Sequence, residues 1–235
     1  MDGTLILEGI VGSTAYGLTR PGSDVDRLGV FVAPLDAVLG LDGPAVIAGK
    51  KASVVTHAPD RTVHELSKFL NLAVACNPTI MELLWLDRWS TQTYEGELLV
   101  GLRRDVLSAA RVRDAFGGYA VGQARRLVRR NSEGKAGFAA DLGPRTAKHG
   151  RHCARLLLTG RALLATGELV VDVSAHRDYL FSMGELAETD ADAFLQKFEV
   201  ALADLDEAAG QSVLPERPDR DRVSRVLLEI RRGLG

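Results

Sequence analysis

Two aspartates near the N-terminus, Asp24 and Asp26, are the residues most suited to chemistry. If residues 24–32 form a strand, the i, i+2 spacing places both carboxylates on one face of it. Two carboxylates this close repel each other, which favours the binding of a cation between them. Oxygen ligands of this kind suit Mg²⁺ or Mn²⁺. The pair therefore predicts a divalent-metal site.

A glycine-rich turn, Gly12-Ser13-Thr14-Ala15-Tyr16-Gly17, precedes this pair and follows an apolar run. Such a turn offers backbone N–H groups to an anion such as a phosphate. A phosphate site beside a pair of metal-binding carboxylates is the minimum apparatus for metal-assisted phosphoryl or nucleotidyl transfer. Two roles are possible for Tyr16: it caps a nucleotide pocket, or it packs on the sheet.

The residues around this motif predict the elements that must hold it. Residues 4–11 form an apolar run that fits a buried strand, residues 27–34 continue the second strand, and residues 53–57 are rich in β-branched side chains. Residues 62–76 have helical spacing, and Asn77-Pro78 ends that helix. From about residue 91 onward the composition changes, and the sequence predicts mainly helices.

The string GSTAYGLTRPGSDVDRLGVFVAP, residues 12–34, resembles the GS…DxD signature of the DNA polymerase β-like nucleotidyltransferase superfamily. It is similar in particular to the RNA repair pathway DNA polymerase β family. NPTIMELLW at residues 77–85 and GELVV at residues 167–171 are further similarities. The resemblance covers most of residues 5–175.

The resemblance implies roles for several residues. The family has an Asp-x-Thr-x-aromatic-Glu-Leu element where this chain has Asp60 to Leu66, which makes Asp60 the third carboxylate, near the attacking hydroxyl. The alternative is that Asp60 is only the N-cap of the next helix. His64 replaces the expected aromatic residue, so we assign it packing alone. Gly12 and Ser13 would bind the triphosphate tail.

A second family element lies in the helical half, where Lys148, His152 and Arg155 resemble the Lys-x-x-x-His-x-x-Arg-Leu-Leu helix. Their spacing of i, i+4 and i+7 places them on one helix face. The resemblance implies that these groups neutralise charge on the β- and γ-phosphates. The alternative is an ordinary basic surface helix.

The net charge of −2 argues against a globally basic nucleic-acid binder, but the charge is unevenly distributed. Residues 103–161 carry 14 Lys/Arg against 4 Asp/Glu, which leaves 15 against 27 in the rest of the chain. The basic region either meets a polyanion such as RNA or is a solvated surface paired with the acidic C-terminal part.

Composition narrows the protein class further. The two cysteines, Cys76 and Cys153, give no disulfide framework and fit a reducing cytosol as buried apolar residues. The chain has no signal-type N-terminus and no apolar run near the ~20 residues that span a membrane. We therefore expect a cytoplasmic protein without membrane contact.

Together these observations predict an α/β (α+β) N-terminal nucleotidyltransferase domain, residues 1–92, with a small mixed twisted sheet. An all-helical region, residues 93–235, follows it. We expect an enzyme that uses Mg²⁺ or Mn²⁺ and transfers a nucleoside monophosphate from an NTP to an acceptor hydroxyl, with an RNA end as the favoured acceptor. Protein and small-molecule acceptors remain alternatives, as does a non-catalytic nucleotide- or RNA-binding module. The sequence does not indicate which base of the NTP is preferred or what the oligomeric state is.

Overall fold

A computed structural model describes residues 3–49, 52–57, 60–132 and 139–234. The chain forms two compact units, and each is described by itself. The first comprises Met1–Ser108 together with Arg217–Gly235, and the second comprises Ala109–Glu216.

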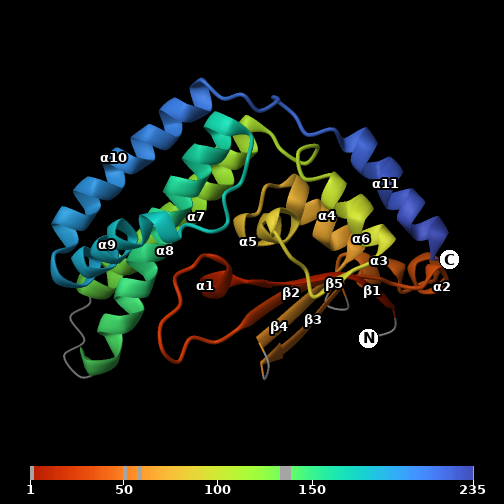
Figure 1. The fold of residues 1–235 in the computed structure, drawn as a ribbon, viewed down its shortest axis with the longest axis horizontal. Helices are drawn as coiled ribbons and strands as arrows, with labels where there is room; N and C mark the ends of the chain where they lie inside the picture. The colour runs from red at the N-terminus through yellow and green to blue at the C-terminus, as the bar shows by residue number, and fades with distance from the viewer. Residues whose placement is uncertain (1–2, 50–51, 58–59, 133–138, 235) are drawn as a thin grey trace. The chain divides into compact units, whose positions relative to one another are not determined.

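A mixed five-stranded sheet forms the centre of the first unit (Figure 1). Its strands, in the order β3-β4-β2-β1-β5, are β1 (Thr4–Val11), β2 (Asp26–Val32), β3 (Ser53–His57), β4 (Asp60–Glu65) and β5 (Thr91–Gln92). β2 and β4 are parallel, whereas the other pairs are antiparallel. Of the three inner strands β4, β2 and β1, the most deeply buried are β1 and β2, whose apolar runs suit a strand covered on both faces.

The first unit also contains the helices that surround this sheet or pack on one another beside it. They are α1 (Gly12–Ala15), α2 (Leu35–Leu39), α3 (Gly43–Ile47), α4 (Leu66–Val74), α5 (Pro78–Met81), the 3₁₀ helix η2 (Glu82–Trp85), α6 (Tyr94–Gly101) and α11 (Arg220–Gly233). α4, α5 and α6 lie on one side of the sheet (Figure 1). On the other face, Phe31 and Val63 form a cluster with Val38 of α2 and Val46 of α3.

The helix predicted from residue 62 starts later than expected. Residues 62–65 belong to strand β4, and α4 begins at Leu66. Short apolar runs fit helix and strand periodicity alike, and here pairing with β2 decides the outcome, because it buries Val63 completely. Glu65 is the N-cap, and its carboxylate accepts a hydrogen bond from Ser67 N at 2.7 Å. Asp60 is therefore not a helix cap.

The second unit is all-helical, which together with the sheet confirms the predicted fold class. Its helices are α7 (Ala109–Ser132), α8 (Ala139–Thr166), η3 (Ser174–His176), α9 (Arg177–Thr189) and α10 (Ala191–Gly210). α8 packs against α7, α9 and α10. α8 and α9 approach closely at two glycines, since a Cβ on Gly150 would lie 2.5 Å from Cβ of Ala187 and one on Gly184 would lie 2.7 Å from the Ala147 carbonyl oxygen.

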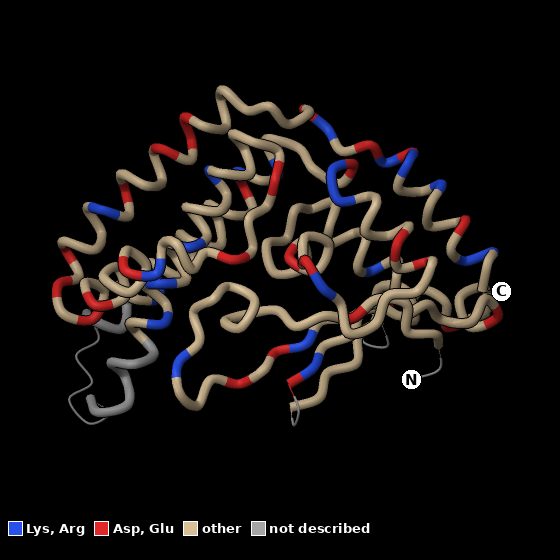
Figure 2. Tube along the Cα trace, viewed as in Figure 1, with Lys and Arg blue, Asp and Glu red and all other residues tan. Residues whose placement is uncertain are grey.

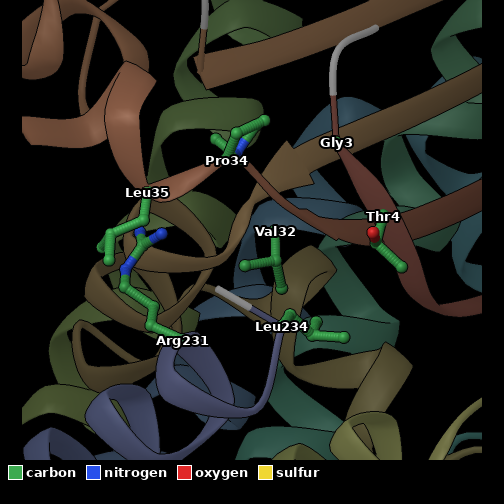
Figure 3. A pocket seen from close by; sticks show the side chains of 8 residues that line it. Gly3, Thr4, Val32, Pro34, Leu35, Arg231 and Leu234 are labelled. Atoms are coloured by element: carbon green, nitrogen blue, oxygen red, sulfur yellow. The ribbon is translucent and has the colours of Figure 1, made fainter. Parts of the chain in front are cut away.

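The last helix, α11, packs in the first unit against α4 and α6. Arg231 anchors it, because Nη2 donates to Glu65 Oε1 at 2.6 Å and to Ser67 Oγ at 2.7 Å. Arg231 also borders a cavity of about 90 Å³ beneath Pro34 and Leu35 (Figure 3). None of the helices in the described ranges has both the length and the apolar character needed to cross a bilayer.

Candidate active site

The glycine turn and the second aspartate lie in direct contact. β1 ends at Val11, which pairs with Asp26, the first residue of β2. Gly12 follows with a φ of +68°, a conformation in which a side chain is strained. A Cβ at this position would collide with Oδ2 of Asp26 and would lie 3.1 Å from its Cγ. The turn can therefore approach the carboxylate only because residue 12 is glycine.

The other two carboxylates lie near this point but do not form a cluster with it. Asp24 is exposed and lies two residues before β2, outside the strand. Asp60 is exposed and is the first residue of β4. Because Arg27 pairs with Arg61 in the parallel ladder, Asp26 and Asp60 begin their strands at the same end of the sheet.

The donor set fits a hard divalent cation, since carboxylate oxygens are the ligands that Mg²⁺ and Mn²⁺ prefer. Within the described parts of the chain, however, no three His, Cys, Asp or Glu side chains are close enough together to hold a metal. The structure therefore brings Asp26 to the turn and Asp60 to the same sheet end, without closing a three-carboxylate centre.

Tyr16 is tied to the helices that cover the sheet. Its hydroxyl donates to Glu82 Oε1 at 2.5 Å. Glu82 is 2% exposed and lies in η2, within the NPTIMELLW string. The hydrogen bond connects the end of the glycine turn to a buried carboxylate 66 residues further along the chain.

One group of residues at this end of the sheet escaped the sequence analysis. Glu8 of β1 is 7% exposed and pairs with Arg61 and Arg27, the residues that directly follow Asp60 and Asp26. A charged residue inside an apolar strand and an arginine after each aspartate were the available signals. The sequence could not show that Glu8 pairs with these two arginines, because the pairing depends on the order of the strands in the sheet.

The predicted phosphate-binding residues lie on α8, in the second unit. Lys148 is exposed, whereas Arg155 is 4% exposed and its Nη2 lies 3.5 Å from Nδ1 of His152. Burial first, and then the positive charge of Arg155, lowers the pKa of His152 to about 3. In the ligand-free fold His152 is therefore neutral at pH 7, and in this form it can offer a phosphate a hydrogen bond.

The basic region of the second unit is partly paired. Arg113 Nε donates to Asp206 at 2.7 Å, and Arg161 Nη1 to Asp204 at 3.3 Å, so acidic side chains of α10 meet arginines of α7 and α8. Figure 2 shows the acidic residues spaced along α10. These two arginines therefore pair with the acidic C-terminal part of the chain, as one of the two alternatives for the basic region predicts. Arg125 and Arg126 on α7 are exposed.

The sheet and the turn that meets the first aspartate of β2 agree with the class that the sequence predicted, the polymerase β-like nucleotidyltransferases. Comparison with protein families confirms it. The chain belongs to the RNA repair pathway DNA polymerase beta family, whose model matches residues 2–228. Membership in this family suggests a transferase.

Two further comparisons add little. No curated protein matches the sequence. The crystal structure of a nucleotidyltransferase-like protein from Exiguobacterium sibiricum 255-15 is similar over 97% of this chain and 74% of that chain, at 14% identity. Its TM-score of 0.30 is too low to define a shared fold.

Proposed function

We propose that this protein is a metal-dependent nucleotidyltransferase that transfers a nucleoside monophosphate from an NTP to an acceptor hydroxyl and releases pyrophosphate. The observation that carries the proposal is the contact between Asp26 and Gly12, at the sheet end where Asp60 also begins a strand. At this point a metal-binding carboxylate lies directly against a turn whose backbone N–H groups can bind an anion. A triphosphate could therefore bind the turn directly and the carboxylate through a metal ion.

In this proposal Asp24 and Asp26 would hold two Mg²⁺ ions, and Asp60 would be a further ligand. The bound metal would supply positive charge at the α-phosphate and make the acceptor hydroxyl more acidic. Gly12 and Ser13 bind the triphosphate tail, and Tyr16 lies at the edge of this subsite.

The reaction forms a bond between the acceptor oxygen and the α-phosphorus and breaks the bond from that phosphorus to the oxygen bridging to the β-phosphate. In this proposal Asp60 would accept the hydroxyl proton. The family resemblance gives the groups on α8 a phosphate-binding role, in which Lys148 and Arg155 would supply positive charge and neutral His152 would donate a hydrogen bond.

The proposed acceptor is an RNA end. The family description names an RNA repair pathway, and the exposed Arg125 and Arg126 provide cations on α7 that could meet a phosphate backbone. Protein hydroxyls and small molecules are the competing acceptors, and a non-catalytic binding module is the competing class.

The test uses each α-labelled NTP with Mg²⁺ or Mn²⁺ and a pool of short RNAs. Asp26→Asn is compared with Asp87→Asn, an exposed aspartate outside the site. We expect label to move to RNA with the wild type and Asp87→Asn, and not with Asp26→Asn. Label on the protein would replace the RNA acceptor by a protein. NTP binding without pyrophosphate release, with RNA, protein or metabolites, would favour the binding module.

A further inference from the structure

Glu8 is a buried carboxylate in an otherwise apolar strand. It is 7% exposed and lies between Leu7, which is fully buried, and Gly9. Its Oε2 accepts a hydrogen bond from Nε of Arg61 at 2.5 Å, and its Oε1 lies 3.7 Å from Nη1 of Arg27. Ser90, just before β5, donates from its hydroxyl to the Glu8 carbonyl oxygen at 3.1 Å. A carboxylate this buried is expensive to leave unpaired, so these contacts hold it in place.

The two arginines occupy special positions in their strands. Arg27 directly follows Asp26 on β2, and Arg61 directly follows Asp60 on β4. Because side chains alternate along a strand, each arginine points to the face opposite its neighbouring aspartate. Arg27 and Arg61 are also partners in the parallel ladder, so both reach Glu8 from the same face. One carboxylate on β1 thus links the starts of two strands, with β2 lying between β1 and β4.

The ion pair with Glu8 matters most at the start of β4, which lies next to the edge of the sheet. Asp60 pairs with His57 at the end of the β3–β4 hairpin, and β3 is the edge strand of the sheet. Strand ends and edge hairpins open more readily than the centre of a sheet. The ion pair from Arg61 to Glu8 ties this exposed end to the inner strand β1.

We propose that Glu8 is a positioning residue for the metal-binding carboxylates, which fixes the starts of β2 and β4 through Arg27 and Arg61. The inference rests on the proposed function, in which Asp26 and Asp60 hold Mg²⁺ or Mn²⁺. Glu8 does not touch the metal or the substrate. It acts from the opposite face of the sheet by limiting how far the two aspartates can separate. Groups that hydrogen-bond directly to metal ligands typically contribute roughly 10–100-fold to metal affinity or activity, so an indirect link such as that of Glu8 is expected at the lower end of this range.

The geometry also ranks the two arginines. Arg61 makes a direct charge-assisted hydrogen bond, whereas Arg27 is 3.7 Å from the carboxylate and donates weakly to Ser90 Oγ at 3.4 Å. Lysine keeps the charge but loses the Nε donor. Arg61→Lys is therefore expected to weaken metal binding more than Arg27→Lys does.

The test measures Mn²⁺ binding by electron paramagnetic resonance in the presence of a non-hydrolysable NTP analogue, together with amide hydrogen exchange in β4. Glu8→Gln is compared with Glu97→Gln, an exposed glutamate on α6. We expect Glu8→Gln to weaken Mn²⁺ binding by about tenfold and to speed exchange at Thr62 and Val63. In turnover, the Mn²⁺ concentration for half-maximal rate should rise while kcat at saturating Mn²⁺ changes little. Glu97→Gln should match the wild type.

Two outcomes would overturn the inference in distinguishable ways. Mn²⁺ binding in folded Glu8→Gln equal to that of the wild type would remove the positioning role, while a loss of binding in Asp26→Asn would leave the proposed function standing. Equal Mn²⁺ binding in Asp26→Asn and the wild type would instead remove the metal assignment, and the inference with it. If Glu8→Gln does not fold, Mn²⁺ binding is compared in Arg61→Lys and Arg27→Lys, which both keep Glu8. Equal Mn²⁺ affinity in these two variants would then overturn the inference.

Discussion

Oδ2 of Asp26 occupies the space that a Cβ on Gly12 would need. The two residues come from different strands, since Gly12 follows β1 and Asp26 begins β2. Their contact joins the turn proposed to bind phosphate to the carboxylate proposed to bind metal. Any side chain at position 12 must displace that carboxylate or move the turn.

Gly12→Ala is therefore expected to lower kcat/KM by at least 100-fold, because it moves a metal ligand and adds strain at a positive φ. The matched control is Gly22→Ala. Gly22 also has a positive φ, +82°, but a Cβ there meets no atom within 4 Å. Both variants pay a backbone strain of roughly 1 kcal/mol, and only Gly12→Ala collides with Asp26. Equal activity in the two variants would show that the Gly12–Asp26 contact does not matter for turnover.

The hydrogen bond from Tyr16 to Glu82 gives a second prediction. Tyr16→Phe keeps the ring and removes the donor, so we expect a loosened glycine turn and an NTP KM that rises about tenfold, which corresponds to the loss of one buried hydrogen bond. Tyr94→Phe, at an exposed tyrosine, is the control. Steady-state kinetics with varied NTP measures the effect. An unchanged KM would mean that the hydrogen bond from Tyr16 to Glu82 does not affect NTP binding.

The sequence predicted the sheet-and-helix architecture because β1 and β2 are continuous apolar runs with clear breaks at Gly12 and Pro34. It placed the start of α4 too early, since pairing of β4 with β2 overrides the local helical pattern of residues 62–65. The Glu8 network was out of reach for a related reason. A carboxylate that links three strands can be recognised only when their order is known.

The neutral state of His152 was likewise not predictable from spacing. The pattern of Lys148, His152 and Arg155 shows that they share a helix face, and it says nothing about how deeply each is buried. The structure buries His152 beside the guanidinium of Arg155, and both effects lower its pKa. The sequence indicates three groups that could carry positive charge, whereas in the fold the imidazole of His152 is neutral at pH 7.

The buried ion pair between Arg231 and Glu65 gives a prediction about stability. Glu65 is fully buried and accepts from Arg231 Nη2 at 2.6 Å, and it also caps α4. Arg231→Met would leave this carboxylate without its charge partner, so we expect a loss of about 3–5 kcal/mol in the free energy of unfolding. Arg232→Met, at the exposed neighbour, should change it by less than about 0.5 kcal/mol. Urea unfolding followed by circular dichroism measures both. Equal losses would show that the pair does not anchor α11.

The lowered pKa values of two histidines predict acid sensitivity. Burial lowers the pKa of His152 to about 3 and that of His64 to about 4, from an ordinary value of 6.5. Below pH 6.5 the unfolded chain therefore binds protons at these residues that the folded chain does not. By linkage, the stability that these neutral histidines contribute is complete above pH 6.5 and is lost as the pH falls toward 4 and then 3.

We expect His152→Gln to have a smaller loss of stability than the wild type between pH 6.5 and 4, because one of the linked protons is removed. The limiting difference in slope is about 1.4 kcal/mol per pH unit, the value for a single proton. Thermal unfolding at a series of pH values measures it, with His176→Gln, at an exposed histidine, as the control. If the pH dependence of His152→Gln matches that of the wild type, His152 is not held neutral by the fold. It could then contribute positive charge to a bound phosphate near pH 6, as its spacing with Lys148 and Arg155 first indicated.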